Sequence, residues 1–432
     1  MPAYTVREWD KLTYGEAEGQ IPSHFADKLA AAALRSQFAG RGGSGVLEHG
    51  RHALRARGVV GIIAAKHCSL EILPKIDAAQ GEAVELQNAA IRKRLVHMLA
   101  VALDLKIDLG AITDLAWQRE TLLEILIRFF CDKLTEAIRK GMPRRYAQHE
   151  DDLPSLRGRL NIVRQFTRHA INSSRLACQF DLLSEDTALN RIMKACVLHL
   201  NRASNNSANQ QRLREFTFVY TDVTDVIPSS LEWDQVVIDR TNSRWQELFE
   251  MARLFLSNRY QTTTGGSGEG TALLFEMNSL FEEYVGRQIT RALAGTDLKV
   301  SLQGGRLFCL SADSTGRGLF QTKPDILIRR RGVVTHVIDT KWKRISSRMD
   351  DPKQGVSQAD VYQMMAYGQL YNAPRLTLLY PHHSRLGHQE MVHARNRITG
   401  HDMVLETASI DVADGTGILD RLRRLIGAEL VL

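Results

Sequence analysis

Two carboxylates and a lysine stand at the ends of two short apolar runs that follow each other closely in the sequence. Asp325 opens the first run, and Asp339 and Lys341 close the second. Both runs are rich in β-branched residues, so we expect two strands. The polar break between them ends at Gly332, which favours a hairpin turn. A turn centred there places Asp325 opposite Asp339, with Cβ atoms about 5 Å apart.

This arrangement suits the hydrolysis of phosphodiesters with Mg²⁺, for which Mn²⁺ is the expected substitute. Mg²⁺ binds oxygen ligands, typically one or two carboxylates together with water and substrate phosphate. Asp339 and Lys341 are two residues apart and therefore lie on one side of their strand. There the lysine would orient water or stabilise charge on the phosphate. The carbonyl of Thr340 is a further candidate ligand. The alternative is a surface hairpin with ordinary ion pairs.

Two expected helices carry further polar residues towards this hairpin. Glu282 and Glu283 follow the apolar positions of an amphipathic pattern over residues 273–285, and either could supply a third carboxylate. Gln363 and Tyr367 are four residues apart, on one face of the second helical pattern. Plain core packing is the alternative for both helices.

The order and spacing of these residues resemble the PD-(D/E)xK nucleases, in the branch whose helix carries Gln-x-x-x-Tyr. Further segments resemble the McrC subunit of McrBC-type modification-dependent restriction systems. These segments are residues 70–76, 156–160, 186–191, 277–285 and 378–381. The resemblance therefore extends over most of the chain and is not confined to the hairpin.

The resemblance implies a role for each residue of the site. Glu282 corresponds to the acid of the first helix, Asp325 to the Pro-Asp acid, and Asp339 to the acid of the (D/E)xK triplet. The implied metal ligands are Glu282, Asp325, Asp339 and Thr340. Lys341 would position or activate the attacking water. Gln363 and Tyr367 would contact DNA or brace the site.

The same resemblance implies partners. The expected complex contains a McrB-like hexamer of an AAA+ GTPase and double-stranded DNA with modified (methylated) cytosine, which is cut only when the GTPase is present. The N-terminal part of the chain would dock into the GTPase ring and stimulate it. GTP would act only through that partner, because the Gly-rich segment 262–270 lacks the Gly-Lys-Ser/Thr ending of a phosphate-binding loop.

The pattern along the chain predicts a mixed α/β, multidomain fold. We expect a small β-rich N-terminal module over residues 1–83, where the GTPase would dock, and a mainly helical middle domain over residues 84–260. A flexible Gly- and Ser-rich linker follows over residues 261–270. Residues 271–432 would form the PD-(D/E)xK-like nuclease domain, a mixed sheet flanked by helices.

Composition agrees with a polyanionic partner without requiring one. Of the 432 residues, 44% are hydrophobic, enough for ordinary cores, and the formal net charge is +7. Five scattered cysteines predict the reduced thiols of a cytoplasmic protein. The N-terminus has no apolar signal segment and no apolar run approaches the length of a membrane span, so we expect no membrane partner.

Alternatives remain at the level of sequence. The chain could be a stand-alone repair or recombination nuclease that cuts without GTP, or a non-cutting adaptor that stimulates a GTPase. The basic segments 144–146 and 157–159 fit a DNA surface, but they fit solvated loops better. His382 and His383 fit unligated loop residues better than a metal site, because no companion Cys or His cluster accompanies them.

Overall fold

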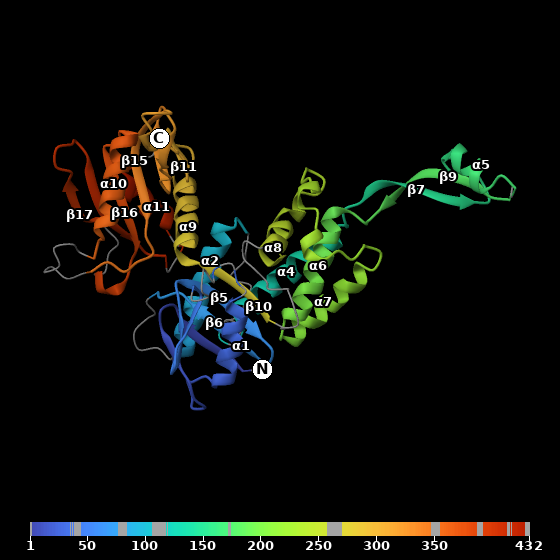
Figure 1. Cartoon of the computed structure of the whole chain (residues 1–432), viewed down its shortest axis with the longest axis horizontal. Coiled ribbons are helices and arrows are strands. Elements are labelled where there is room, and N and C mark those ends of the chain that lie inside the picture. Colours follow the sequence, from blue (N-terminus) through green and yellow to red (C-terminus); the bar gives the residue numbers. More distant parts are fainter. Residues whose placement is uncertain are drawn as a thin grey trace. The chain divides into compact units, whose positions relative to one another are not determined.

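Figure 1 shows the computed structural model of the chain. It describes residues 2–34, 36, 38, 45–76, 84–105, 118, 120–171, 174–256, 270–346, 355–386, 392–412, 415 and 417–427. The chain forms two compact units, the first from residues 1–122 with 263–432 and the second from residues 123–262. The predicted linker 261–270 lies outside the described residues except for its last residue.

The first unit begins with two small sheets and a helix. A four-stranded sheet has the order β1 (Ala3–Arg7), β6 (Cys68–Leu73), β5 (Val59–Ala65) and β10 (Gly270–Glu276). A three-stranded sheet has the order β2 (Lys11–Thr13), β4 (Ala53–Ala56) and β3 (Leu47–His49). Helix α1 (Ser23–Leu34) packs on β5 and contributes Ala26 and Leu29 to a shared hydrophobic core.

Strand β10 comes from far along the chain and completes the first sheet. It pairs antiparallel with β5, at a point where a Cβ added to Gly61 would lie 2.0 Å from the carbonyl oxygen of Leu273. The helix expected over residues 273–285 is therefore wrong at its start: residues 273–276 belong to β10, and α9 begins at Met277. A short apolar run is equally consistent with a buried strand and with a buried helix, so the sequence pattern does not distinguish the two.

The C-terminal part of the first unit is built on a six-stranded mixed sheet. Its order is β11 (Leu298–Leu302), β14 (Ile326–Arg330), β15 (Val333–Thr340), β16 (Arg375–Pro381), β18 (Val404–Ile410) and β17 (Val392–Arg397). Strands β15, β16 and β18 run parallel, and the remaining neighbours are antiparallel. Strands β12 (Phe308–Ser311) and β13 (Gly318–Gln321) form a separate ribbon.

Helices cover this sheet and hold it against the rest of the unit (Figure 1). Helix α9 (Met277–Ala292) contacts β11 and β15, and α10 (Gln358–Tyr371) contacts β15 and β16. Helices α2 (Val84–Ala102) and α11 (Ile418–Ile426) both pack against α9. A short 3-10 helix, η7 (Ser384–Leu386), follows β16. Helix α10 begins where Ser357 accepts a hydrogen bond from the Asp360 N–H, a normal N-cap.

The second unit is mainly helical and carries one long β-ribbon. Its helices include α4 (Leu122–Arg139), α5 (Ile162–Arg168), α6 (Ala188–Ala203), α7 (Ser207–Val219), α8 (Gln246–Leu256), and the short η3 (Pro228–Ser230), η4 (Trp233–Gln235) and η5 (Ser243–Trp245). The ribbon consists of β7 (Arg145–Leu153), β9 (Leu176–Ser184) and β8 (Arg159–Leu160). The sequence did not predict it, because seven of the nine residues of β7 are exposed and give no apolar alternation.

The mixed α/β, multidomain fold is confirmed by these sheets and helices. The domain limits given above stay predictions; before entering α9 the chain returns through β10 to the N-terminal sheet. In the part of the chain that the structure describes, every helix is too short or too polar to cross a bilayer.

Candidate metal centre

The predicted hairpin is present and has the predicted pairing. Strands β14 and β15 are antiparallel, with Ile326 opposite Ile338. Asp325 directly precedes β14 and therefore falls opposite Asp339. The two turn residues, Arg331 and Gly332, have φ values of +51° and +89°, as expected in a two-residue turn that matches the twist of the strands.

The side chains of Asp339 in β15 and of Lys341 just after it lie on the side of the sheet that α10 covers. Val337 lies in the hydrophobic core with residues of α10, and Asp339 and Lys341 follow it at intervals of two. The structure therefore brings Gln363 and Tyr367 of α10 to the predicted acid and lysine.

A chain of contacts links these four residues. The Asp339 side chain is nearly buried, and its Oδ2 lies 2.7 Å from Lys341 Nζ. Lys341 Nζ also donates to Gln363 Oε1 at 3.2 Å. Gln363 Nε2 lies 3.4 Å from Asp339 Oδ1 and donates to Tyr367 Oη at 2.8 Å. One amide thus fixes the acid, the lysine and the tyrosine relative to one another.

Asp325 is held by Thr340, the middle residue of the triplet. Its Oδ2 accepts the Thr340 backbone N–H at 2.7 Å and the Thr340 hydroxyl at 2.8 Å. These two bonds join the ends of the hairpin strands and fix one carboxylate oxygen. The role expected of the Thr340 carbonyl as a metal ligand stays a prediction.

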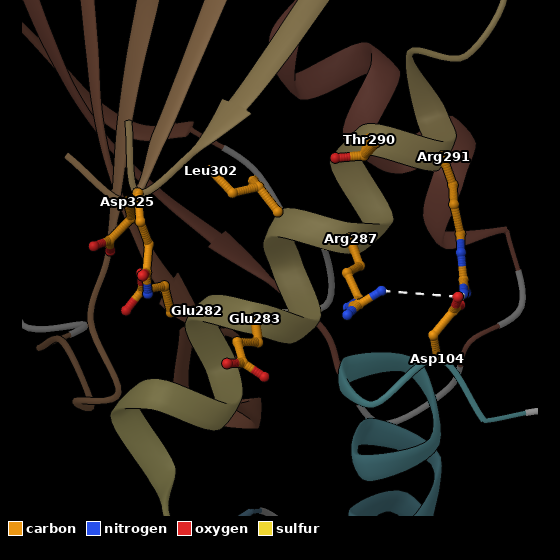
Figure 2. Close-up of a pocket in the computed structure, with 9 residues that line it drawn as sticks. Asp104, Glu282, Glu283, Arg287, Thr290, Arg291, Leu302 and Asp325 are labelled. Atoms are coloured by element: carbon orange, nitrogen blue, oxygen red, sulfur yellow. Dashed lines mark hydrogen bonds and ion pairs between the residues drawn. The ribbon is translucent and has the colours of Figure 1, made fainter. Parts of the chain in front are cut away.

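Glu282 approaches the hairpin acids from α9. Its Oε1 accepts a hydrogen bond of 2.8 Å from Gln303 Nε2, just after β11. Glu282 and Asp325 line one end of a cavity of about 530 Å³ (Figure 2). Glu283 lines the same cavity, but Glu282 is the acid whose charge raises the pKa of Asp325. This favours Glu282 over Glu283 as the third acid.

The pKa values of the carboxylates show that they repel one another. Burial, then the charge of Glu282, raises the pKa of Asp325 from 3.8 to about 6. Burial, then the charge of Asp325, raises the pKa of Asp339 to about 6 as well. Burial also raises the pKa of Glu282. These carboxylates are therefore close enough to repel one another, and burial removes much of the water that would screen them. A bound cation would relieve this repulsion.

Lys341 responds in the opposite way. Burial by itself would lower the pKa of its ammonium group, but Asp339 and Asp360 raise it more, and the net pKa lies above its usual range. The lysine is therefore a cation at neutral pH.

The donor set fits a hard divalent cation. Within the described residues no three His, Cys, Asp or Glu side chains converge as a ready-made cage. Mg²⁺ does not require one, because one or two carboxylates with water and phosphate complete its shell. Asp325 and Asp339, adjacent across the hairpin and mutually repelling, meet that requirement.

Two residues of this region were not predicted from the sequence. Asp360 of α10 is buried, with its carboxylate 4.0 Å from Lys341 Nζ and 3.2 Å from Lys343 Nζ. Its position three residues before Gln363, on the same helical face, was the available signal. Trp342 donates through Nε1 to Glu8 Oε1 at 2.6 Å, a contact that no local pattern indicates.

The remaining sequence candidates have hydrogen-bond partners outside this group of residues. His382 and His383 make hydrogen bonds to the Ser409 hydroxyl and the Ile345 carbonyl. Arg144 and Arg159, from the two basic segments, bond to Glu185 and Gln179 beside the ribbon of the second unit. The five cysteines are free thiols, and four of them are buried.

Comparison with known proteins gives a family and a fold. A family model described as McrBC 5-methylcytosine restriction system component matches residues 54–381. The fold is similar to a chain in the refined half-complex from the tetradecameric assembly of Thermococcus gammatolerans McrB AAA+ hexamers with bound McrC. That similarity has a TM-score of 0.73 and 20% identity, and it covers 98% of this chain and 99% of the other.

A second solved structure, the Thermococcus gammatolerans McrBC complex determined by cryo-EM, has a chain similar to this one. The TM-score is 0.53 and the identity 24%, over 68% of this chain and 88% of that one. No curated protein matches the chain.

Proposed function

We propose a function from the fact that this chain belongs to the McrBC 5-methylcytosine restriction system component family. In this proposal, the chain is the Mg²⁺-dependent endonuclease subunit of its restriction complex. The observation that carries the proposal is the contact chain from Asp339 through Lys341 and Gln363 to Tyr367, beside Asp325. A buried acid, Asp339, beside a partly buried lysine and a second acid, Asp325, is the combination that metal-dependent phosphodiester hydrolysis uses.

Each residue has a distinct task in this proposal. Asp325 and Asp339 would hold the metal, with Glu282 as the third acid. A bound Mg²⁺ would make a coordinated water more acidic and neutralise charge on the scissile phosphate. Thr340 fixes the orientation of Asp325 through two hydrogen bonds.

Lys341 would act as a hydrogen-bond donor. The raised pKa of its ammonium group keeps it protonated at neutral pH, so it is unsuited to remove a proton from water. It would orient the attacking water or stabilise the charge that develops on the phosphate.

Gln363 and Tyr367 would brace the site. Tyr367 is buried, which leaves its hydroxyl to the hydrogen bond with Gln363 and not to DNA. Gln363 in turn holds Lys341 towards Asp339.

The proposed partners are an AAA+ GTPase hexamer and double-stranded DNA with modified cytosine. The similar solved chain belongs to an assembly of McrB AAA+ hexamers with bound McrC, and the family is described by 5-methylcytosine restriction. GTP would be hydrolysed by the partner, which would license cutting by this chain.

A cleavage reaction tests the proposal. The purified chain, its co-encoded GTPase, GTP and Mg²⁺ are mixed with methylated or unmethylated DNA of the same sequence. We expect cutting only of the methylated DNA, and only with all components present. Cutting by the chain alone without GTP would instead identify a stand-alone nuclease. Stimulated GTP hydrolysis with intact DNA would identify a non-cutting adaptor.

A further inference from the structure

The cavity beside the metal centre has a second, cationic end. One end is lined by Asp325 and Glu282, and the other by Arg287 and Arg291 of the same helix α9. Figure 2 shows both arginines extending from α9 towards Asp104, which follows α2. One cavity thus joins the proposed metal ligands to a pair of guanidinium groups.

The spacing along α9 places these arginines on a regular track. Arg287 and Arg291 are four residues apart and lie on one helical face. Glu283 shares this face, four residues before Arg287, whereas Glu282 points from a neighbouring side of the helix (Figure 2). Measured along the helix axis alone, the arginines follow Glu282 by about 7.5 Å and about 13.5 Å, at 1.5 Å per residue. One DNA strand advances about 3.4 Å per nucleotide along its axis, so both arginines lie within a few nucleotides of a phosphate held at the acids.

In the free protein, Asp104 forms ion pairs with both arginines. Its carboxylate lies 2.8 Å from the Arg291 guanidinium and 3.9 Å from that of Arg287. Arginine recognises carboxylate and phosphate oxygens with the same donor geometry. The Asp104 side chain is 66% exposed, and the arginines 45% and 41%, so the pair contributes little to stability and can be exchanged for another anion.

We infer that Arg287 and Arg291 bind backbone phosphates of the DNA strand beside the scissile phosphate, and that Asp104 competes with DNA for them. The inference rests on the proposed nuclease function and adds a subsite to it. The acids at the other end of the cavity would repel DNA until a cation is present, so strand binding and metal binding support each other.

The test compares DNA affinities of full-length variants. All carry Lys341→Met, which prevents cutting while keeping the acids, and fluorescence anisotropy with a labelled duplex in Mg²⁺ gives the dissociation constant. Asp104→Asn is the first variant. Asp104 has a φ of +55°, which asparagine adopts readily, so the backbone is preserved while the charge is removed. We expect DNA to bind about three- to tenfold more tightly.

The arginine variants should act in the opposite direction. Arg287→Gln with Arg291→Gln should weaken binding about tenfold or more. It should also reduce the slope of log affinity against log salt by about two, because each lost phosphate contact changes the slope by about 0.9. If the contact between Asp104 and the two arginines is only structural, Asp104→Asn should instead leave the DNA affinity unchanged or lower it.

A matched ion pair serves as the control. Arg330 and Asp297 lie in the same part of the chain, 3.1 Å apart and similarly exposed, and do not line the cavity. Asp297→Asn changes the net charge by the same single unit as Asp104→Asn. Arg330→Gln removes one of the two positive charges that the double arginine variant removes. Each control should alter affinity less than about twofold.

The inference is overturned if the Asp104 and arginine variants behave like these controls, or if the Lys341→Met chain binds no DNA while the complete wild-type complex cuts it. The proposed function survives either result. Failure of the wild-type complex to cut any DNA would instead remove the proposed function, and this inference with it.

Discussion

The three carboxylates of the site differ in what holds each of them. Thr340 holds Asp325, Lys341 and Gln363 hold Asp339, and Gln303 holds Glu282. Each acid therefore keeps its place although the acids raise one another's pKa. The metal-free protein carries an electrostatic cost that a divalent cation would remove.

This cost predicts a pH dependence of stability in the absence of metal. The pKa values of Asp325 and Asp339 rise from 3.8 in the unfolded chain to about 6 in the folded one. The folded chain then binds more protons than the unfolded chain between these values. Its free energy of unfolding should fall as the pH rises from 3.8 to about 6, by on the order of 3 kcal/mol for each carboxylate.

Asp339→Asn removes one of the repelling charges. In EDTA at pH 8, we expect this variant to unfold at a higher temperature than the wild type. Added Mg²⁺ should raise the Tm of the wild type but not that of the variant. Differential scanning calorimetry measures both. An equal Mg²⁺-dependent gain in Tm for the two proteins would argue against a metal site at Asp339.

At the scale of elements, the hairpin depends on an irregularity that places its acids opposite each other. The turn pairs Arg330 with Val333, and this register alone would set Asp325 against Ile338. A bulge leaves Thr335 as an extra residue on β15, and the register then sets Asp325 against Asp339. The bulge therefore determines which side chain faces the first acid.

The turn gives a prediction about stability. Gly332 has a φ of +89°, and no atom lies within 4 Å of an added Cβ, so any cost of substitution comes from the backbone alone. Gly332→Val should destabilise the protein by about 1–3 kcal/mol, whereas Gly332→Asn should cost clearly less, because asparagine tolerates positive φ. Urea unfolding compares the two; equal losses would mean that the turn conformation is not the cause.

Sequence reasoning succeeded where a pattern was local. The hairpin, the helix carrying Gln363 and the pairing of Asp325 with Asp339 all follow from alternation, turn residues and helical spacing. The predicted pairing is right because a turn centred on Gly332 lies half a residue after the observed centre, which shifts the register by one residue, as the bulge does. The ribbon of β7 and β9 was missed because its residues are exposed and non-alternating.

Contacts between distant segments left no local signal. The sequence pattern predicts a helix for residues 273–276, which form the end of strand β10, because the pairing of β10 with β5 joins residues about two hundred positions apart. Glu8 and Trp342 likewise meet only in the folded chain. Asp360 was within reach of sequence reasoning, one helical turn before Gln363, but a single acid on a helix is normally a solvated residue.

At the scale of the whole molecule, the N-terminal residues contact the segment that directly follows Lys341. Trp342 directly follows Lys341, and its ring lies 5.3 Å from that of Phe281, the neighbour of Glu282. The buried carboxylate of Glu8 accepts hydrogen bonds from the Trp342 indole and from the Lys75 N–H. A structural change in the N-terminal module can therefore shift Trp342, which is adjacent to the proposed catalytic Lys341 and packs on the neighbour of Glu282.

Trp342→Phe removes the indole donor and keeps the aromatic contact. The loss of a hydrogen bond to a buried carboxylate should destabilise the protein by about 1–3 kcal/mol. Cleavage by the complex should fall several-fold while stimulation of the GTPase persists. Glu8→Gln retains an acceptor for the indole and should have a smaller effect on both quantities. Loss of GTPase stimulation in the Trp342→Phe variant would place this residue in partner binding instead.

The most direct measurement is the single-turnover rate at which the GTP-supplied complex cuts methylated DNA with Asp339→Asn in place of the wild-type chain. The control variant is Asp297→Asn, which removes an exposed acid of the same domain. We expect Asp339→Asn to lose cutting by about a thousandfold or more, since a metal ligand contributes several kcal/mol to the reaction. The variant should keep the fold and stimulate the GTPase as the wild type does. Asp297→Asn should cut at the wild-type rate. Cutting by Asp339→Asn at a rate close to that of the control would contradict a metal-dependent nuclease site on this hairpin.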